Sequence, residues 1–545
     1  MPKLPTDIQL EVLDNVHLKS DLKALCLVSK SWRALAIPRL YRDVSLITWP
    51  LRPRDRNRIP HTSRFVRSVA AGAGLHLKYT RILTIENSQP PPEPTVNPLN
   101  FESLSDHEDN HEDGVAVEYG LGRILEMIPR NILHTFRYIS DTPLTFDLTN
   151  RMHVYQPNLQ HVHATVEEVR FKNAMPLTFY GKTLRTLDIA TMDPGTVQVF
   201  LRLLLVEWPQ LERLSIGLRA KDSTAPTTGY DLGSPPKYFD RSLLEFNLCY
   251  FPCHGGSFQT MSKLFNLSKL KRMTLQDCPN ADLLLESMGE LARRQTISLR
   301  HLAVYVRNPD SVVSLLQNCT SLTDLHLAWE TFTTTGTALP ATLESIVPNL
   351  RTLALQFREE ATMGADSVAQ TMFKNLLRPT LGIRYIACQI RIEDFNTCNW
   401  QQSNFHQRLS NFGSLYDLRV VHFRISPDDL LLSAIKYSED EVTCTAQRFA
   451  NSVFAHMEEQ GVCSKLQVVI VGCFNRDENS SVSDFQIPRH CFVKRHQCDS
   501  FQQIVVVGVP IPAYMIRQLE PECDLLDFDF DCDWVGGWAS RIRNV

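Results

Sequence analysis

Cysteine, histidine and glycine stand close together in the run Cys249-Tyr250-Phe251-Pro252-Cys253-His254-Gly255-Gly256. Two thiolates and an imidazole at this spacing could form half of a zinc site, and His-Gly-Gly could supply the backbone N–H groups of an esterase oxyanion hole. Each chemistry needs a second half that the sequence lacks, because no Cys-x-x-Cys pair follows and no Gly-x-Ser-x-Gly sequence occurs. We therefore expect a buried Cys249 and a surface His254, where a strand runs into a loop.

A second group of possible metal ligands, His107, Asp109, His111 and Asp113, lies in an acidic run that follows a proline cluster. Residues 88–118 are too polar to fold against a core and are predicted to form a disordered loop, so a solvated charge run explains these side chains better than a metal site. The nucleotide-binding sequences G-x-G-x-x-G and G-x-x-x-x-G-K-[ST] are absent, and nothing singles out a catalytic cysteine among the fourteen. We expect a protein that is not an enzyme and has no cofactor and no metal site.

Upstream of that loop is a basic stretch made of Arg52, Arg54, Arg56, Arg58, Arg64 and Arg67. Guanidinium groups in such a stretch could hold a phosphorylated partner through bidentate contacts. Alternatively the stretch is a solvated loop that partly neutralises the acidic one, and we favour this interpretation. A further turn-rich loop is predicted at residues 221–237.

The composition excludes several classes of protein. The chain has 56 basic and 60 acidic residues, a formal charge of −4, so no overall positive field draws it to nucleic acid or to a membrane surface. Its longest apolar stretch, residues 504–509, is ended by prolines and is far shorter than the ~20 residues of a membrane-spanning helix. Charges break up the N-terminal pattern, so we expect no signal peptide. Cysteines without regular spacing suit reduced thiols, and we expect a cytoplasmic or nuclear protein.

Residues 4–46 predict three short and very apolar helices. Thr6-Asp7-Ile8-Gln9 has the spacing of a capping box, so the first helix begins near Asp7, and Ser20-Asp21 supplies the cap and acidic first turn of the second. Apolar side chains in residues 22–28 cover nearly the whole circumference of the second helix, which is typical of a helix buried on all sides. A module of about 40 residues cannot bury such a helix alone. Its surplus apolar surface must meet the rest of the chain or a partner.

The order of residues in this segment resembles the F-box. The resemblance rests on Leu4-Pro5, on Leu27-Val28-Ser29-Lys30-Ser31-Trp32-Arg33 and on Pro38-Arg39-Leu40-Tyr41, an exit common in fungal members, and it covers 43 of the 545 residues. F-box proteins are the substrate receptors of Skp/cullin/F-box ubiquitin ligases. The resemblance therefore implies that this segment binds a Skp-type adaptor and, through it, a cullin. The implied adaptor-binding residues are Leu4, Pro5, Ile8, Leu22, Leu25, Leu27, Val28 and Trp32.

Each of these residues could instead pack inside the helical module, and this alternative is open above all for Leu25 and Trp32. The turn at residues 16–20 also lacks the proline that often stands between the first two F-box helices. We expect a changed turn there, with adaptor binding retained.

A repeated pattern follows residue 150. The pattern L-x-x-L-x-L recurs, with substitutions, from Leu184, Leu211, Leu270, Leu299, Leu322 and Leu350, and weaker copies begin at Leu159, Leu243, Leu415 and Leu466. From Leu159 to Leu350 successive copies start 23 to 32 residues apart, the range of a leucine-rich repeat with one strand and one helix per turn.

Helical patterns lie between the predicted strands. One has Val197, Phe200, Leu201, Leu204, Leu205 and Trp208 on a single face, and another is capped by Asp310 with Val312, Leu315, Leu316 and Cys319 inward. Such units cannot bury their apolar faces singly. The predicted fold is therefore an α/β solenoid with parallel strands on its concave side and helices outside.

This organisation resembles the leucine-rich-repeat class of F-box proteins, but it departs from the regular pattern. Only the copy that begins at Leu270 has the expected asparagine or cysteine at its ninth position, Cys278, so we expect an irregular solenoid. Residues 527–534 alternate acidic and apolar side chains, which predicts a strand that caps the last repeat. The predicted domains are an F-box at 1–46, a connecting segment with a first irregular repeat at 47–87, the loop at 88–118 and the solenoid at 119–545.

The sequence as a whole favours a receptor that brings an adaptor and an unknown protein substrate together. Side chains between the leucines of the inner sheet would contact the substrate, and the candidates are Arg213, Arg272, Thr274, His301, Tyr305, Asp324, His326 and Arg419. Two alternatives stay open. The adaptor complex could serve assembly without ubiquitin transfer, or the N-terminal helices could be only a cap on a scaffold that contacts no adaptor.

A deletion separates the last alternative from the others. If the N-terminal helices form an adaptor-binding module, removing residues 1–46 leaves the repeats folded, which is the outcome that we expect. A cap would behave differently, because its removal exposes the apolar end of the first repeat. Thermal unfolding followed by circular dichroism measures the difference, and a large fall in melting temperature would favour the cap.

Overall fold

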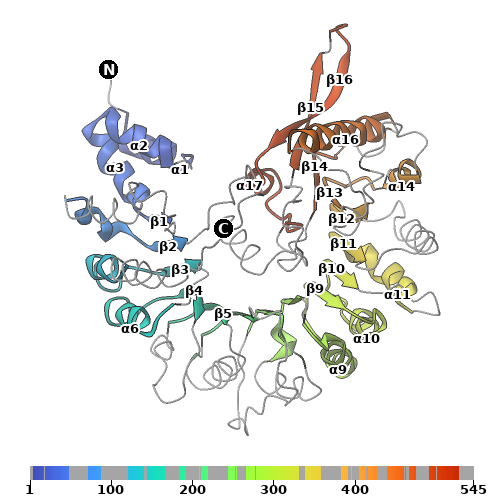
Figure 1. Cartoon of the computed structure of the whole chain (residues 1–545), viewed down its shortest axis with the longest axis horizontal. Coiled ribbons are helices and arrows are strands. Elements are labelled where there is room, and N and C mark those ends of the chain that lie inside the picture. Colours follow the sequence, from blue (N-terminus) through green and yellow to red (C-terminus); the bar gives the residue numbers. More distant parts are fainter. Residues whose placement is uncertain are drawn as a thin grey trace, which may run out of the picture. The chain divides into compact units, whose positions relative to one another are not determined.

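The computed structural model describes residues 4–16, 19–47, 72–86, 121–139, 144–166, 183–191, 208, 210–218, 243–251, 253, 266–276, 278–329, 338–357, 382–390, 395, 404–412, 415–425, 439–459, 461, 465–473, 490–498 and 500–526 (Figure 1). The chain divides into two compact units. Unit 1 comprises Met1–Ala220 and Leu232–Arg241, and unit 2 comprises Lys221–Asp231 and Ser242–Val545. The N-terminal helices belong to unit 1 and the C-terminal segment belongs to unit 2.

Unit 1 opens with the three predicted helices, α1 (Thr6–Asp14), α2 (Lys19–Val28) and α3 (Lys30–Leu40). They form a small core of their own, in which Leu13, Leu22 and Ala36 are buried. The Ser29 hydroxyl accepts a hydrogen bond from the Trp32 N–H at 3.2 Å and so caps the start of α3. An ion pair between Asp14 and Arg39 also joins α1 to α3.

The predicted caps of the first two helices are wrong. Helix α1 begins at Thr6, with Pro5 at its N-cap and no side-chain cap. Gln9 instead donates to the Leu4 carbonyl at 3.0 Å and accepts a hydrogen bond from Ser31 at 2.9 Å, so it holds α1 against α3. Helix α2 begins at Lys19, which places the predicted cap inside its first turn. In both cases a tertiary contact or an earlier helix start takes precedence over the local capping pattern.

Among the described residues of unit 1, six parallel strands follow, and each of the first five pairs with the next one along the chain. They are β1 (Asp43–Ile47), β2 (Ile82–Glu86), β3 (Thr135–Ile139), β4 (His161–Val166), β5 (Thr186–Thr191) and β6 (Arg213–Leu218). Between them lie the 3-10 helix η2 (Ala73–Tyr79) and the helix α6 (Phe146–Tyr155).

In unit 2 the strands β7 to β14 are parallel where their pairing is described, and the hairpin β15–β16 adds two antiparallel strands. The strands are β7 (Glu245–Cys249), β8 (Arg272–Gln276), β9 (His301–Val306), β10 (Asp324–Trp329), β11 (Thr352–Phe357), β12 (Tyr385–Ile390), β13 (Val420–Ile425), β14 (Val468–Cys473), β15 (His490–Cys498) and β16 (Ile504–Ile511). The helices are η4 (Leu267–Lys269), α9 (Ala281–Arg294), α10 (Asp310–Asn318), α11 (Leu339–Ile346), η5 (Val347–Asn349), α14 (Asn404–Phe412), α16 (Glu439–Glu459) and α17 (Tyr514–Leu519).

Before most of the described parallel strands, a single backbone carbonyl accepts two N–H groups from the start of the next strand. The Arg81 carbonyl accepts the His134 and Thr135 N–H groups at 2.9 and 3.0 Å, and in unit 2 the Arg300 carbonyl accepts those of Thr323 and Asp324 at 2.8 and 2.9 Å. The same arrangement recurs at the carbonyls of Arg42, His134, Gln160, Arg185, Leu244, Lys271, Thr323, Arg351, Arg384 and Arg419. Each pair of strands joined in this way is therefore held in register from its first residue.

This register confirms the predicted strands. All ten copies of the leucine pattern end in a strand, and nine of the strands begin two residues after the first leucine, as β9 does after Leu299. The structure also contains β1, β2, β3, β12 and the β15–β16 hairpin, which the pattern missed because their leucine positions are more heavily substituted. The described chain is thus a set of N-terminal helices followed by a mixed α/β region with a mostly parallel sheet.

The predicted helix near residue 310 is also present. Helix α10 buries Val312, Leu315 and Leu316, and Cys319 after it is buried as well. Asp310 does not cap this helix, because it is the first helical residue and its carboxylate accepts the Ala338 N–H at 3.2 Å instead. Of the helix predicted at residues 197–208 only the buried Trp208 lies among the described residues.

Several predicted features lie outside the described residues. They are the arginine stretch at 52–67, the loop at 88–118 with its possible metal ligands, the loop at 221–237, His254 and the strand at 527–534. Cys249 is described and is buried as predicted.

The two faces of the sheet in unit 2 differ in what covers them. Figure 1 shows α9, α10 and α11 on one side of the strands β9 to β11. Leu302, Leu325 and Leu353, which are register partners in these strands, are completely buried. The opposite face carries the register partners His301 and Asp324, and we call it the inner face. None of the helices among the described residues combines the length and the apolar character needed to cross a membrane.

A close approach of two helices gives a test of the packing. A Cβ atom added to Gly289 in α9 would lie 2.8 Å from Ser314 Cβ and 2.9 Å from the Leu315 backbone nitrogen of α10. We expect Gly289→Ala to lower the free energy of unfolding by about 1 to 3 kcal/mol, because overpacking outweighs the gain in helix propensity. Chemical unfolding followed by circular dichroism measures it. Gly382→Ala is the control, since no atom lies within 4 Å of its added Cβ, and equal effects of the two variants would contradict the prediction.

Candidate functional site

Large apolar side chains are exposed on the N-terminal helices. At the end of α2, Leu27 and Val28 are 87 % and 64 % exposed, and Leu4 before α1 is 51 % exposed. Ile8 and Val12, one turn apart on α1, are also exposed. Monomeric proteins seldom leave so many large apolar residues open on so small a module, so this surface fits a partner.

The remaining predicted adaptor-binding residues divide between this surface and the core of the module. Pro5 is exposed at the N-cap of α1. Leu22 is buried in the core, and the half-buried Leu25 and Trp32 pack against it. The structure thus leaves Leu4, Pro5, Ile8, Leu27 and Val28 available for direct contact, whereas Leu22, Leu25 and Trp32 support the helices from inside.

The first strand limits where the module ends. Strand β1 begins at Asp43 and pairs with β2 over its whole length, so residues 43–46 belong to the sheet. Thr80 Oγ1 also donates to the Tyr41 carbonyl at 3.0 Å. A deletion that removes the helices and leaves the sheet intact therefore stops at Leu40.

The second candidate site is the inner face of unit 2, where the C-terminal segment, residues 514–526, packs against the strands. Its apolar side chains join a buried cluster with the inner-face residues of β11 to β15. The members are Ala354, Tyr385, Ala387, Val420, Val468, Ile470, Cys491, Ile516, Cys523, Leu525 and Leu526.

Acidic side chains of the same segment meet basic ones on the inner face. Glu520 contacts Arg419 at 3.1 Å, Glu522 contacts Arg351 and Arg384 at 3.1 and 3.2 Å, and Asp524 contacts His301, His326 and Arg272 at 3.1, 3.5 and 4.0 Å. The segment therefore crosses the strands from β13 back to β9. Every second residue from 520 to 524 is acidic. Burial, with the Glu520 carboxylate alongside, raises the pKa of Tyr385, whose hydroxyl donates to Glu520 at 2.9 Å.

The eight predicted substrate-binding residues are less open than expected. Thr274, His301, Tyr305, Asp324 and His326 are buried. Arg213, Arg272 and Arg419 are half-buried. Four of the eight, Arg272, His301, His326 and Arg419, contact the C-terminal segment directly. The role of these residues in binding a substrate stays a prediction. A substrate at the four residues would have to compete with the chain's own C-terminal segment.

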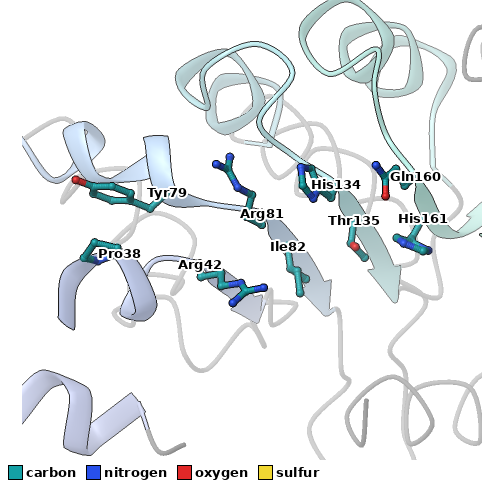
Figure 2. Close-up of a pocket in the computed structure, with 9 residues that line it drawn as sticks. All are labelled: Pro38, Arg42, Tyr79, Arg81, Ile82, His134, Thr135, Gln160 and His161. Atoms are coloured by element: carbon teal, nitrogen blue, oxygen red, sulfur yellow. The ribbon is translucent and has the colours of Figure 1, made fainter. Parts of the chain in front are cut away.

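The third feature is a cleft of about 430 Å³ in unit 1, at the edge where β2, β3 and β4 begin (Figure 2). It is lined by Pro38, Arg42, Tyr79, Arg81, Ile82, His134, Thr135, Gln160 and His161. Among these described lining residues none carries a carboxylate, so the cleft favours a neutral or anionic group. The Arg42 and Arg81 guanidinium groups point in different directions in Figure 2, and Arg81 donates to the Ile132 carbonyl at 3.1 Å. They do not form an assembled anion clamp.

Both histidines of the cleft are held neutral. Burial, with Arg81 and Arg42 nearby, lowers the pKa of His134. Burial, followed by the effects of His163 and of neighbouring arginines, lowers the pKa of His161 to about 4. The His161 ring Nδ1 lies 2.9 Å from the Thr186 hydroxyl, a partner that a neutral imidazole can keep. At neutral pH the positive charge of the cleft therefore comes from its arginines.

Comparison with known protein families gives one finding. Residues 1–47 match the F-box-like family model, so the chain carries an F-box-like domain at its N-terminus. F-box domains in general bind Skp-type adaptors. No curated protein matches the chain.

The contacts of Glu520, Glu522 and Asp524 were missed by the sequence analysis. The acidic residues alternate in the run Glu520-Pro521-Glu522-Cys523-Asp524, which was a usable local signal. Their partners, however, lie about 100 to 250 residues earlier in the chain, from Arg419 back to Arg272. No local pattern connects positions so far apart.

His161 predicts a pH dependence of stability. Because its pKa is about 4 in the folded chain and 6.5 unperturbed, the unfolded chain takes up a proton between these values and the folded chain does not. Above pH 6.5 His161 is neutral in both states and has no effect on stability. The free energy of unfolding falls as the pH drops from about 6.5 to 4. We expect His161→Gln to flatten this fall, measured as urea midpoints across the range. Gln160→Ala alters the cleft without removing a titrating group and should keep the wild-type slope, and an unchanged slope in His161→Gln would refute the assignment.

Proposed function

We propose that the chain is a substrate-recognition subunit of a Skp/cullin/F-box ubiquitin ligase. The observation that carries the proposal is the exposure of Leu27 and Val28 at the end of α2, in a segment that matches the F-box-like family. Two large apolar side chains in a LVSKxWR sequence stay open to solvent although the module has its own core. Covering them with a Skp-type adaptor would bury apolar surface, which drives association.

In this proposal the chain does no bond chemistry itself. The adaptor would connect the N-terminal helices to a cullin, and the α/β region would hold an unknown protein substrate. The contribution to catalysis would be proximity, because a substrate lysine is kept near a ubiquitin-charged enzyme of the complex. The complex would act in the cytoplasm or the nucleus.

We further propose that the α/β region is a degenerate leucine-rich-repeat solenoid of the kind found in F-box proteins, here of fungal type. The leucine pattern, the parallel strand after each copy and the helices on one face support this assignment. The ninth-position residue Cys278 contacts the Gln276 carbonyl at 3.4 Å, as a turn residue of such a repeat would. The fungal assignment rests on Pro38-Arg39-Leu40-Tyr41, where Pro38 lies inside the last turns of α3.

The inner face is the proposed substrate surface in unit 2, with Arg272 and Arg419 as its half-buried cationic members. Arg213, which is also half-buried, is a separate candidate in unit 1. Because Arg272 and Arg419 already contact Asp524 and Glu520, a substrate would bind beside the C-terminal segment or displace it. An acidic substrate segment would match the charges that the face now contacts.

The alternative is an F-box scaffold that assembles proteins without ubiquitin transfer. It shares the adaptor contact and differs in the next step. Recovery of a cullin together with the adaptor would support the ligase, and recovery of the adaptor alone would support the scaffold.

The double substitution Leu4→Asp with Leu27→Asp tests the adaptor contact. Both side chains are exposed, so the variant should stay folded by circular dichroism and lose co-purification with a Skp-type adaptor. Loss of two central apolar contacts commonly weakens an interface by about 100-fold or more.

Leu75→Asp is the matched control, because Leu75 is a 77 % exposed leucine in η2, outside the three helices, and its replacement should leave binding intact. Failure of the wild-type chain to bind the adaptor would refute the receptor proposal. Equal loss in the control would show that the effect is not specific to the N-terminal helices.

A further inference from the structure

Three side chains that commonly bind metals converge on the inner face of unit 2. His301 Nδ1 lies 3.1 Å from one carboxylate oxygen of Asp524, and His326 Nε2 lies 3.5 Å from the other. One ligand atom from each of the three residues falls within 4.8 Å of the other two. The two imidazole rings are tilted against each other by 38°, with centroids 5.3 Å apart. All three side chains are buried.

The fold brings these residues together from distant parts of the chain. His301 is the first residue of β9, and His326 is the third residue of β10, whose first residue is the register partner of His301. The histidines are therefore diagonal neighbours on one face of adjacent parallel strands. Asp524 reaches them because the preceding acidic residues and the buried Leu525 hold the C-terminal segment across the strands.

We propose that His301, His326 and Asp524 bind a divalent transition-metal ion, with Zn²⁺ as the best match. Zinc bonds of about 2.0 to 2.1 Å in a tetrahedral arrangement place ligand atoms roughly 3.3 Å apart. The two histidine nitrogens lie 3.1 and 3.5 Å from the carboxylate, each from a different oxygen, so both separations are close to that value. Two imidazole nitrogens with one carboxylate favour zinc over calcium or magnesium, which prefer sites made of oxygen ligands.

The chemistry of the three side chains suits a metal ion. A neutral imidazole offers the lone pair of one ring nitrogen, and a carboxylate supplies a negative charge that partly balances a divalent cation. The metal would in turn compensate the Asp524 carboxylate, which is buried in a place where an uncompensated charge is costly.

Arg272 is the competing source of positive charge. Its guanidinium group lies 4.0 Å from the same Asp524 carboxylate, at the margin of an ion pair, and its side chain is 34 % exposed. A metal at the three-residue site would be nearer to the carboxylate and buried with it. Arg272 would then repel the ion slightly, so its removal should not weaken metal binding.

Unit 1 contains a comparison pair that lacks the third ligand. His163 Nδ1 lies 2.5 Å from an Asp188 oxygen, and both side chains are buried on neighbouring strands. Among the described residues this pair belongs to no group of three metal-binding side chains. It separates the effect of a buried histidine and aspartate from that of a metal site.

A bound metal would fasten the C-terminal segment to β9 and β10. Two of its ligands come from the strands and one from the segment, so loss of the ion would loosen the segment over the surface proposed for the substrate. The metal site itself rests only on the geometry of the three residues, and it stands or falls independently of adaptor binding.

The test uses the full-length chain, first stripped with a chelator and then titrated with Zn²⁺. We expect one ion per chain by elemental analysis after dialysis, a rise in melting temperature on Zn²⁺ addition, and slower proteolysis of the C-terminal segment. Co²⁺ in place of Zn²⁺ should give the visible absorption bands of a tetrahedral site. Asp524→Asn and His326→Gln should each lower the metal content at least tenfold, whereas Arg272→Gln should retain it.

His163→Gln is the control, because it removes a buried histidine without touching the three ligands, and it should keep the full metal content. If a variant fails to fold, the metal content and Co²⁺ spectrum of the wild-type chain still decide the question. A wild-type chain that binds less than one-tenth of an equivalent of Zn²⁺ would overturn the proposal. So would stoichiometric binding that Asp524→Asn and His326→Gln, both folded, leave unchanged.

Discussion

The register of the parallel strands in the α/β region depends on one recurring pair of hydrogen bonds. In it, the backbone carbonyl before one strand accepts two N–H groups from the start of the next strand. It recurs from Arg42 to Arg185 in unit 1 and from Leu244 to Arg419 in unit 2. Parallel strands must be held in register, since a slip by one residue would turn every side chain to the opposite face. Because the first hydrogen bonds of each strand are fixed, the leucines of successive repeats reach the same buried face although the connecting segments differ in length.

A fixed register also aligns unlike side chains into rows on the inner face. His301, Asp324, Thr352 and Tyr385 occupy one row of partners across β9 to β12. Strand spacing is about 4.8 Å, and two residues of an extended segment span about 6.8 Å. A segment with an acidic residue at every second position can therefore meet a new basic partner as it crosses the strands. The C-terminal segment does so, and its apolar side chains are buried in the cluster on the inner face.

The N-terminal helices differ from the sheet, because they leave an apolar surface open to solvent. Leu13, Leu22 and Ala36 give the module a core, and the Asp14–Arg39 ion pair and the Gln9 contacts hold its helices together. Leu27 and Val28 take no part in this core and are exposed to solvent. Exposed apolar side chains such as Leu27 and Val28 add nothing to the core of the module, and they are of the kind that contacts a partner.

The sequence alone determined the elements whose signals are local. Leucines at fixed offsets predicted the strands, the apolar helices predicted the N-terminal module, and both are present because each depends on residues a few positions apart. Tertiary structure alone decided which side chains meet. Gln9 leaves the predicted cap for Ser31, the inner-face residues are buried, and Asp524 joins His301 and His326 across some 200 residues. The Gln9 contact depends on how α1 packs against α3, and the other contacts depend on strand register and on the path of the C-terminal segment. No short stretch of sequence encodes any of these.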